Sequence, residues 1–177
     1  MQKSIIVIFI VFFFLSSAFA DDKAGEEIYT QSLQEIKKAM NFKTAVIAEM
    51  TEGNVNGIPL KDLIFRELDM KHPDLYEKFL NESKKEKVII NSSNDTIVPN
   101  ESILPEVSSG GFSWKEIREN FSDFDTIIYF SHISFLDNQA LVLVNNLMFG
   151  PYGEGYFYIF EKKGDGWYLI DSLHAYK

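Results

Sequence analysis

The chain has 177 residues, a net charge of −9 at pH 7 and no cysteine. An excess of carboxylates is repelled by phosphate backbones and anionic lipid surfaces, so nucleic acid is not an expected partner. Without cysteine, the protein has no disulfides, thiol catalysis or cysteine-ligated zinc, and packing alone must stabilise its fold.

The first 20 residues predict a secretory signal peptide. A positively charged start precedes an unbroken apolar run from Ile5 to Leu15, and Ala18 and Ala20 supply the small residues of a cleavage site. A membrane anchor is the alternative, but this run is shorter than the about 20 apolar residues that a spanning helix needs. We therefore expect cleavage after Ala20 and an exported protein, periplasmic or secreted.

We expect residues 21–177 to form a single α+β domain whose helical portion occupies residues 21–82. Apolar residues recur at helical spacing between Glu26 and Met50. The pattern lasts barely three heptads, which favours an amphipathic helix docked on a sheet over a coiled coil. The apolar positions are Tyr29, Leu33, Ile36, Met40, Ile47 and Met50.

A pair of shorter helices is predicted after the loop at residues 51–57, which contains two glycines and two asparagines. Pro59 suits the first turn of one helix and Pro73 the first turn of the next. The residue before a proline avoids the helical conformation, so the pair should bend at His72-Pro73.

Residues 83–112 read as a long connection, with a short strand possible at Val88–Asn91. Several Asn-x-Ser/Thr triplets lie in and near it, and we attribute them to chance in an Asn- and Ser-rich segment rather than to glycosylation. Residues 113–177 then form a capped helix and a sheet. Ser113 and Glu116 make a capping box, which predicts a helix to about Phe121.

Four strands are predicted after this helix, and the gaps between them are too short for helical crossovers. The sheet should therefore be a four-stranded antiparallel β-meander on which the N-terminal helices pack. The turns are Asp137-Asn138, a loop at residues 149–154, and residues 162–166. The predicted strands are Thr126–Leu136, Gln139–Leu147, Gly155–Glu161 and Trp167–Tyr176.

These strands are too apolar for a sheet with one wet face. Helices can cover one face, and the other must be covered by the long connection, by a partner subunit or by closure of the sheet on itself. Tyrosines on the strands would suit a binding face. The possible contact surface comprises Phe149 and Tyr152 in the loop, with Tyr156 and Tyr158 on the strand that follows.

The C-terminal motifs resemble those of a group of small exported bacterial proteins of uncharacterised function. The series is a Ser-Phe strand, an Ala-Leu-Val strand, a Gly-x-Gly-aromatic strand and a Gly-Trp strand. The resemblance covers about Trp114 to Ile170, implies a shared fold and supplies no catalytic residue. The motifs are Ile133–Phe135, Gln139–Val144, Gly153–Phe157, Glu161–Gly164 and Gly166–Ile170.

No catalytic, cofactor or metal site is predicted. We interpret His72 as an exposed turn residue, whereas His132 and His174 would share a face only if their strands curl together, and zinc needs a third ligand. The glycine-rich stretch Gly150–Gly155 joins strand to strand, whereas a phosphate cradle precedes a helix.

We therefore expect an exported, non-catalytic protein that binds another protein or a small ligand through the sheet face or the Phe149–Glu154 loop. One alternative is a small enzyme with a site between helix and sheet, and a deep pocket holding His132 beside a buried carboxylate would favour it. The other alternative is a structural envelope protein.

Overall fold

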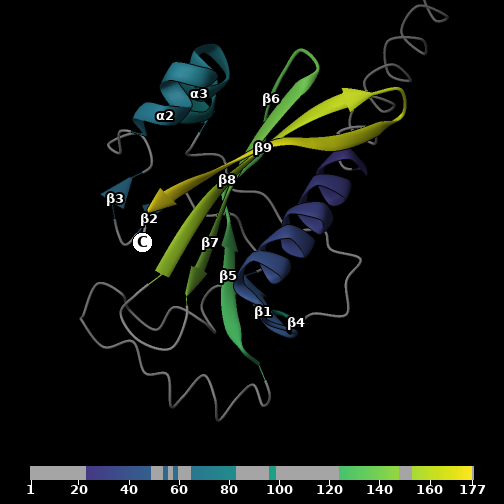
Figure 1. The fold of residues 1–177 in the computed structure, drawn as a ribbon, viewed down its shortest axis with the longest axis vertical. Coiled ribbons are helices and arrows are strands. Elements are labelled where there is room, and N and C mark those ends of the chain that lie inside the picture. Colours follow the sequence, from purple (N-terminus) through teal and green to yellow (C-terminus); the bar gives the residue numbers. More distant parts are fainter. Residues whose placement is uncertain are drawn as a thin grey trace, which may run out of the picture.

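The computed structural model describes residues 23–48, 54–55, 58–59, 65–82, 96–98, 124–147 and 153–176. It shows a β-sheet with a helix over residues 23–40, here called the N-terminal helix, on one side (Figure 1). Two shorter helices, α2 (Arg66–Lys71) and α3 (Pro73–Glu82), lie on the other side. The predicted signal peptide, the strand at 88–91 and the capped helix at 113–121 fall outside the described residues.

Seven strands of the described chain form one mixed sheet in the order β4-β1-β5-β7-β8-β9, with β6 also paired to β7. Residues Asn54–Val55 (β2) and Ile58–Pro59 (β3) form a separate two-stranded hairpin. The strands of the main sheet are β1 (Ala45–Ala48), β4 (Thr96–Val98), β5 (Thr126–Phe130), β6 (Ser134–Leu136), β7 (Gln139–Leu147), β8 (Gly153–Lys163) and β9 (Gly166–Tyr176).

The α+β class is confirmed, but the predicted four-stranded antiparallel meander is wrong in two respects. The sheet is larger and mixed, because β1 pairs in parallel with both β4 and β5. The first predicted strand is also two strands, β5 and β6, and both pair with β7. The remaining pairs, β7–β8 and β8–β9, are antiparallel neighbours as predicted.

The turns between these strands follow from local chemistry. Asp137 takes a left-handed φ of 53° in the two-residue turn between β6 and β7. Gly164 takes a φ of 63° between β8 and β9, a conformation that costs glycine little because it has no Cβ. Both reversals lie within the turns expected from the sequence.

The predicted helix over Glu26–Met50 is too long. It ends at residue 40, where Asn41 adopts a φ of 55°, the left-handed conformation that commonly terminates helices. The apolar stretch Ala45–Ala48 then forms β1, with all four residues buried. A fully buried strand shows no alternation of apolar and polar residues, so periodicity does not distinguish it from a helix. Ile47 therefore matched the helical spacing although it lies in a strand.

The pair of helices bends at His72-Pro73 as predicted, but its start differs. Pro59 belongs to β3 instead of a first helical turn, and α2 begins at Arg66. The long connection contains β4, which pairs with β1 at the edge of the sheet. A parallel partner distant in the chain stabilises this strand, so local sequence alone gave it no signal.

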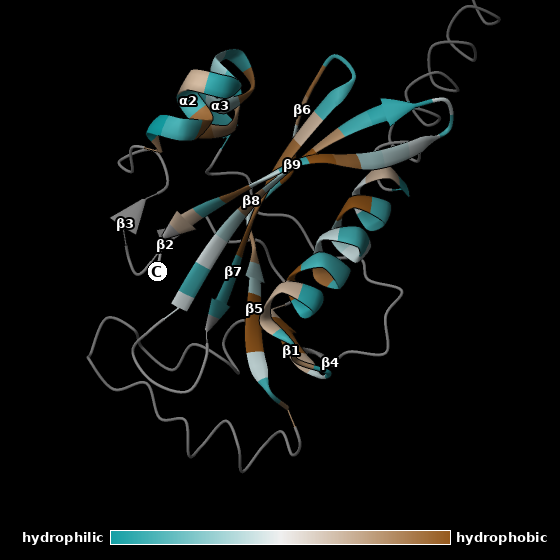
Figure 2. Ribbon diagram, viewed as in Figure 1, coloured by the Kyte–Doolittle hydropathy of each residue, from teal (hydrophilic) through white to brown (hydrophobic). Residues whose placement is uncertain are grey.

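Helices pack on both faces of the sheet, which explains the apolar runs in the middle of β5, β7 and β8 (Figure 2). On β7, Val142 and Val144 pack under the N-terminal helix, while Leu141 and Leu143 pack under α2 and α3. Helices therefore bury side chains on the second face as well as on the first. Successive side chains alternate between two dry faces.

A polar residue interrupts the predicted first strand. The Ser131 Oγ accepts the Leu143 N–H at 2.9 Å and donates to the His132 carbonyl at 2.8 Å, and Ser131 is 1% exposed. The Tyr29 hydroxyl donates to the Ser131 carbonyl at 3.3 Å. These bonds satisfy buried backbone groups where regular strand pairing pauses between β5 and β6.

Candidate functional site

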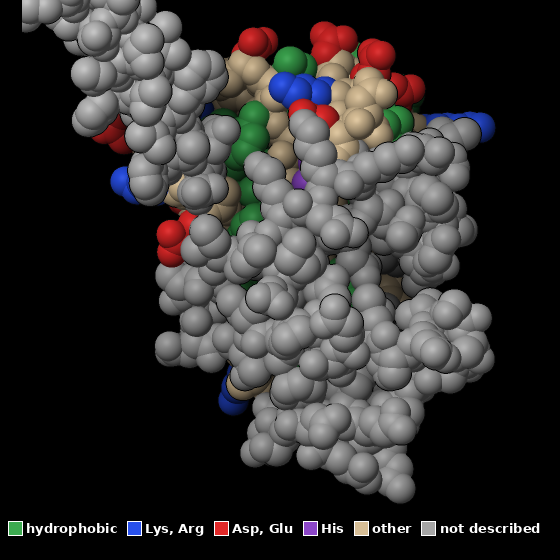
Figure 3. All heavy atoms as spheres, turned by 180° about the vertical axis from the view of Figure 1, so that it is seen from behind, with side chains coloured by type: hydrophobic (Ala, Val, Ile, Leu, Met, Phe, Trp, Pro, Cys, Tyr) green, Lys and Arg blue, Asp and Glu red, His purple; other side chains and the backbone are tan. Residues whose placement is uncertain are grey.

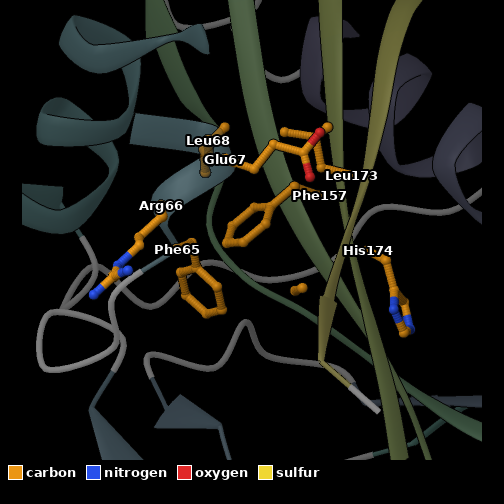
Figure 4. Close-up of a pocket in the computed structure, with 8 residues that line it drawn as sticks. Phe65, Arg66, Glu67, Leu68, Phe157, Leu173 and His174 are labelled. Atoms are coloured by element: carbon orange, nitrogen blue, oxygen red, sulfur yellow. The ribbon is translucent and has the colours of Figure 1, made fainter. Parts of the chain in front are cut away.

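A cavity of about 460 Å³ lies between the start of α2 and the strands β8 and β9 (Figure 4). Its volume falls within the range of about 300–1,000 Å³ that is typical of small-ligand sites. Arg66, Glu67 and His174 also border it. The apolar side chains that line it are Phe65, Leu68, Phe157, Leu173 and Ala175.

The aromatic wall of the cavity is held by contacts from three elements. The Phe65 ring meets the Phe157 ring edge-on, with centroids 4.7 Å apart, and Phe79 lies 5.7 Å from Phe157. The Phe65 N–H donates to the Tyr76 hydroxyl at 3.2 Å, and burial raises the pKa of that phenol. Because Phe157 is 1% exposed, its ring belongs to the core, and the half-buried Phe65 extends this aromatic packing to the cavity.

A cluster of charges stands beside the cavity. The Glu67 carboxylate lies 3.1 Å from the Lys71 ammonium, which also lies 3.3 Å from the Asp171 carboxylate. Glu67 extends toward β9, whereas the Arg66 guanidinium points away from the cavity (Figure 4). One ammonium is thus shared by two carboxylates, and the cluster carries a net negative charge.

The surface view agrees with the acidic composition. Asp and Glu side chains gather along the upper end of the described surface, with few Lys and Arg side chains among them (Figure 3). Such a surface attracts cations over several ångströms and repels anions.

The predicted contact surface does not coincide with the cavity. Tyr156 and Tyr158 lie on the opposite face of β8, stacked with centroids 6.2 Å apart. Tyr158 is 2% exposed and belongs to the core, so it presents no contact surface. Phe149 and Tyr152 lie outside the described residues.

Tyr156 is half-buried, and its hydroxyl is bound within the protein. It donates to the Glu154 carboxylate at 2.9 Å and contacts the Met40 sulfur at 3.9 Å. Burial and this carboxylate raise the pKa of Tyr156. The ring also lies 4.9 Å from the imidazole of His174, which therefore points away from the cavity that its backbone borders.

A second polar cluster contains a serine, a histidine and a glutamate. The His132 Nε2 lies 2.9 Å from the Ser134 Oγ, which donates to the Glu82 carboxylate at 3.0 Å. His132 is 2% exposed and stacks on Phe79 at 4.9 Å. The serine stands between imidazole and carboxylate, whereas nucleophilic triads place the imidazole in the middle. None of the three residues lines the cavity. The hydrogen bond between Ser134 of β6 and Glu82 of α3 instead ties α3 to the sheet.

The histidines do not converge. His72 ends α2 and its side chain is 16% exposed, so it is not the exposed turn residue that we predicted; it lies 3.8 Å from Asp171. His132 and His174 pack on opposite faces of the sheet. Within the described residues, no three His, Cys, Asp or Glu side chains gather in a way that could hold a metal ion.

No helix in the described ranges has the length and apolarity to cross a membrane. Comparison with protein-family models, with curated proteins and with solved structures gave no match. The resemblance of the C-terminal motifs to small exported bacterial proteins therefore stays a prediction.

Proposed function

We propose that this protein is an exported, non-catalytic binding protein that holds an apolar group in the cavity between α2, β8 and β9. The observation that carries the proposal is the aromatic wall of Phe65 and Phe157 beside an open volume of about 460 Å³. The signal-peptide pattern of residues 1–20 supports export.

The lining favours binding over catalysis. Catalysis needs a base within hydrogen-bond reach of a nucleophile or substrate proton. Among the described residues that border the cavity, the carboxylate is Glu67, which is 61% exposed and bound to Lys71. An apolar ligand instead gains about 0.8 kcal/mol for each methylene that it buries, and the apolar lining can supply this term without a catalytic group.

A fluorescence titration of the mature chain with N-phenyl-naphthylamine, a neutral apolar fluorophore, tests the proposal. We expect saturable binding to the wild-type protein and its loss in Ala175→Phe, which fills the cavity with a ring. Ser172→Phe is the matched control, because Ser172 is exposed on the same strand and does not line the cavity.

Melting temperatures show whether both variants fold. Absence of binding to the folded wild-type protein, or undiminished binding to folded Ala175→Phe, would refute the proposed function and leave the structural envelope role as the better explanation.

A further inference from the structure

We propose that the occupant of this cavity is a small amphipathic cation, with an aliphatic or aromatic body and an ammonium head. The inference rests on the proposed function and adds the chemical class of the ligand. The apolar wall would receive the body, and the head would lie beside Glu67, the carboxylate that borders the cavity on the side of β9.

The first step is the local balance of charge. The Lys71 ammonium lies 3.1 Å from the Glu67 carboxylate and 3.3 Å from the Asp171 carboxylate, so two carboxylates share it. A carboxylate has about four lone-pair positions, so Glu67 retains acceptor capacity after it binds Lys71. A second ammonium placed here would give Glu67 a cation of its own, while Asp171 keeps Lys71 at 3.3 Å and His72 at 3.8 Å.

The second step is the orientation of the other charged groups. Arg66 borders the cavity, but its guanidinium points away from it, so it does not offer an anion a partner inside (Figure 4). The His174 imidazole faces Tyr156 and Glu154 on the other side of β9. The charge that faces the apolar wall is therefore that of Glu67.

The third step is the field of the whole protein. The net charge of −9 raises the local concentration of cations at the surface and lowers that of anions. An anionic or neutral ligand of the same shape would keep the apolar contacts but would lack this electrostatic attraction. The charge of the head group therefore distinguishes a cationic ligand from the other two classes.

Isothermal titration of the mature chain with octylammonium, octanol and octanoate at pH 7 tests the inference, because these probes share one alkyl chain and differ in charge. We expect octylammonium to bind roughly two- to fivefold more tightly than octanol, the range of an exposed ion pair, and octanoate to bind most weakly. The differences should shrink when ionic strength rises from about 0.1 M to about 1 M, because the Debye length falls from about 10 Å to about 3 Å.

Two isosteric variants test whether the preference for octylammonium comes from Glu67. Glu67→Gln should abolish the preference for octylammonium over octanol while octanol binding stays unchanged. Asp69→Asn removes the same charge from the same helix at an exposed position that does not border the cavity, so the preference should persist. In Ala175→Phe all three probes should fail to bind.

The outcomes separate this inference from the proposed function. Equal affinities for the three probes, or tightest binding of octanoate, would overturn the inference that the ligand is a cation. The proposed apolar binding cavity would then stand. Octylammonium binding that survives Ala175→Phe would show attraction to the acidic surface alone and would also overturn it. Failure of all three probes on the folded wild-type protein would overturn both proposals.

Discussion

The two faces of the sheet are covered in different ways, and the difference locates the cavity. The N-terminal helix has 18 described residues, extends about 27 Å at 1.5 Å per residue and shares one core cluster with side chains of β1, β5, β7, β8 and β9. On the other face, α2 and α3 contain 6 and 10 residues and bend at His72-Pro73. The cover on this face thus consists of two short helices instead of one long one, and the cavity lies at the start of α2. Among the described residues, the cavity therefore lies where the helical cover is interrupted.

The largest expected effect compares one aromatic residue from each face. Phe157→Ala and Phe160→Ala remove neighbouring side chains that are 1% and 0% exposed, and each should lower the free energy of unfolding by about 3–5 kcal/mol. Phe157 borders a cavity, whereas Phe160 lies in the core under the N-terminal helix, so the loss of Phe157 should cost less. Urea denaturation measures both values. An equal or larger cost for Phe157 would mean that the cavity side is packed as tightly as the other.

Ser131→Ala tests the segment on which both faces converge. Its carbonyl accepts from Tyr29 of the N-terminal helix, and the next residue, His132, stacks on Phe79 of α3. Removing the hydroxyl leaves the buried Leu143 N–H without its side-chain acceptor, which should cost about 1–3 kcal/mol. Thermal unfolding measures the loss, with Ser172→Ala as an exposed control. A cost as small as that of the control would argue against this role.

Gln31→Ala tests how the N-terminal helix protects the edge strand β9. The Gln31 amide donates to the Trp167 carbonyl at 2.8 Å, and the Glu27 carboxylate accepts the Trp167 N–H at 3.0 Å. Both groups occupy the positions that a neighbouring strand would take. We expect a loss of about 0.5–1.5 kcal/mol and more self-association. Sedimentation velocity over a range of protein concentrations measures the latter, and an unchanged monomer would contradict edge protection.

The smallest expected effect depends on pH. Hydrogen bonds from the Thr44 and Lys43 backbone N–H groups hold the pKa of Asp125 below its usual value. A folded-state pKa below the unfolded one means that the carboxylate adds stability above the unfolded pKa and that this stability is lost as pH falls through the folded pKa. Asp125→Asn should therefore lower the melting temperature slightly at pH 7 and have less effect in acid. An effect that grows in acid would contradict this sign.

Local patterns predicted much of the C-terminal half. Asp137-Asn138 and Gly164-Asp165 supply tight turns from their own chemistry, and the apolar runs between them identify strands that pair with their sequence neighbours. The apolar stripe from Tyr29 to Met40 also predicted its helix, because helical periodicity depends only on the residues of the helix itself.

The tertiary structure alone decided the rest. β1 is a strand because Ala45 lies beside Thr126, and the cavity has an aromatic wall because Phe65, just before α2, packs on Phe157 of β8. Neither partner is near the other in the chain, so no window of sequence contains both. Turn and helix signals depend on neighbours in sequence, whereas parallel pairing and the coverage of a sheet depend on neighbours in space.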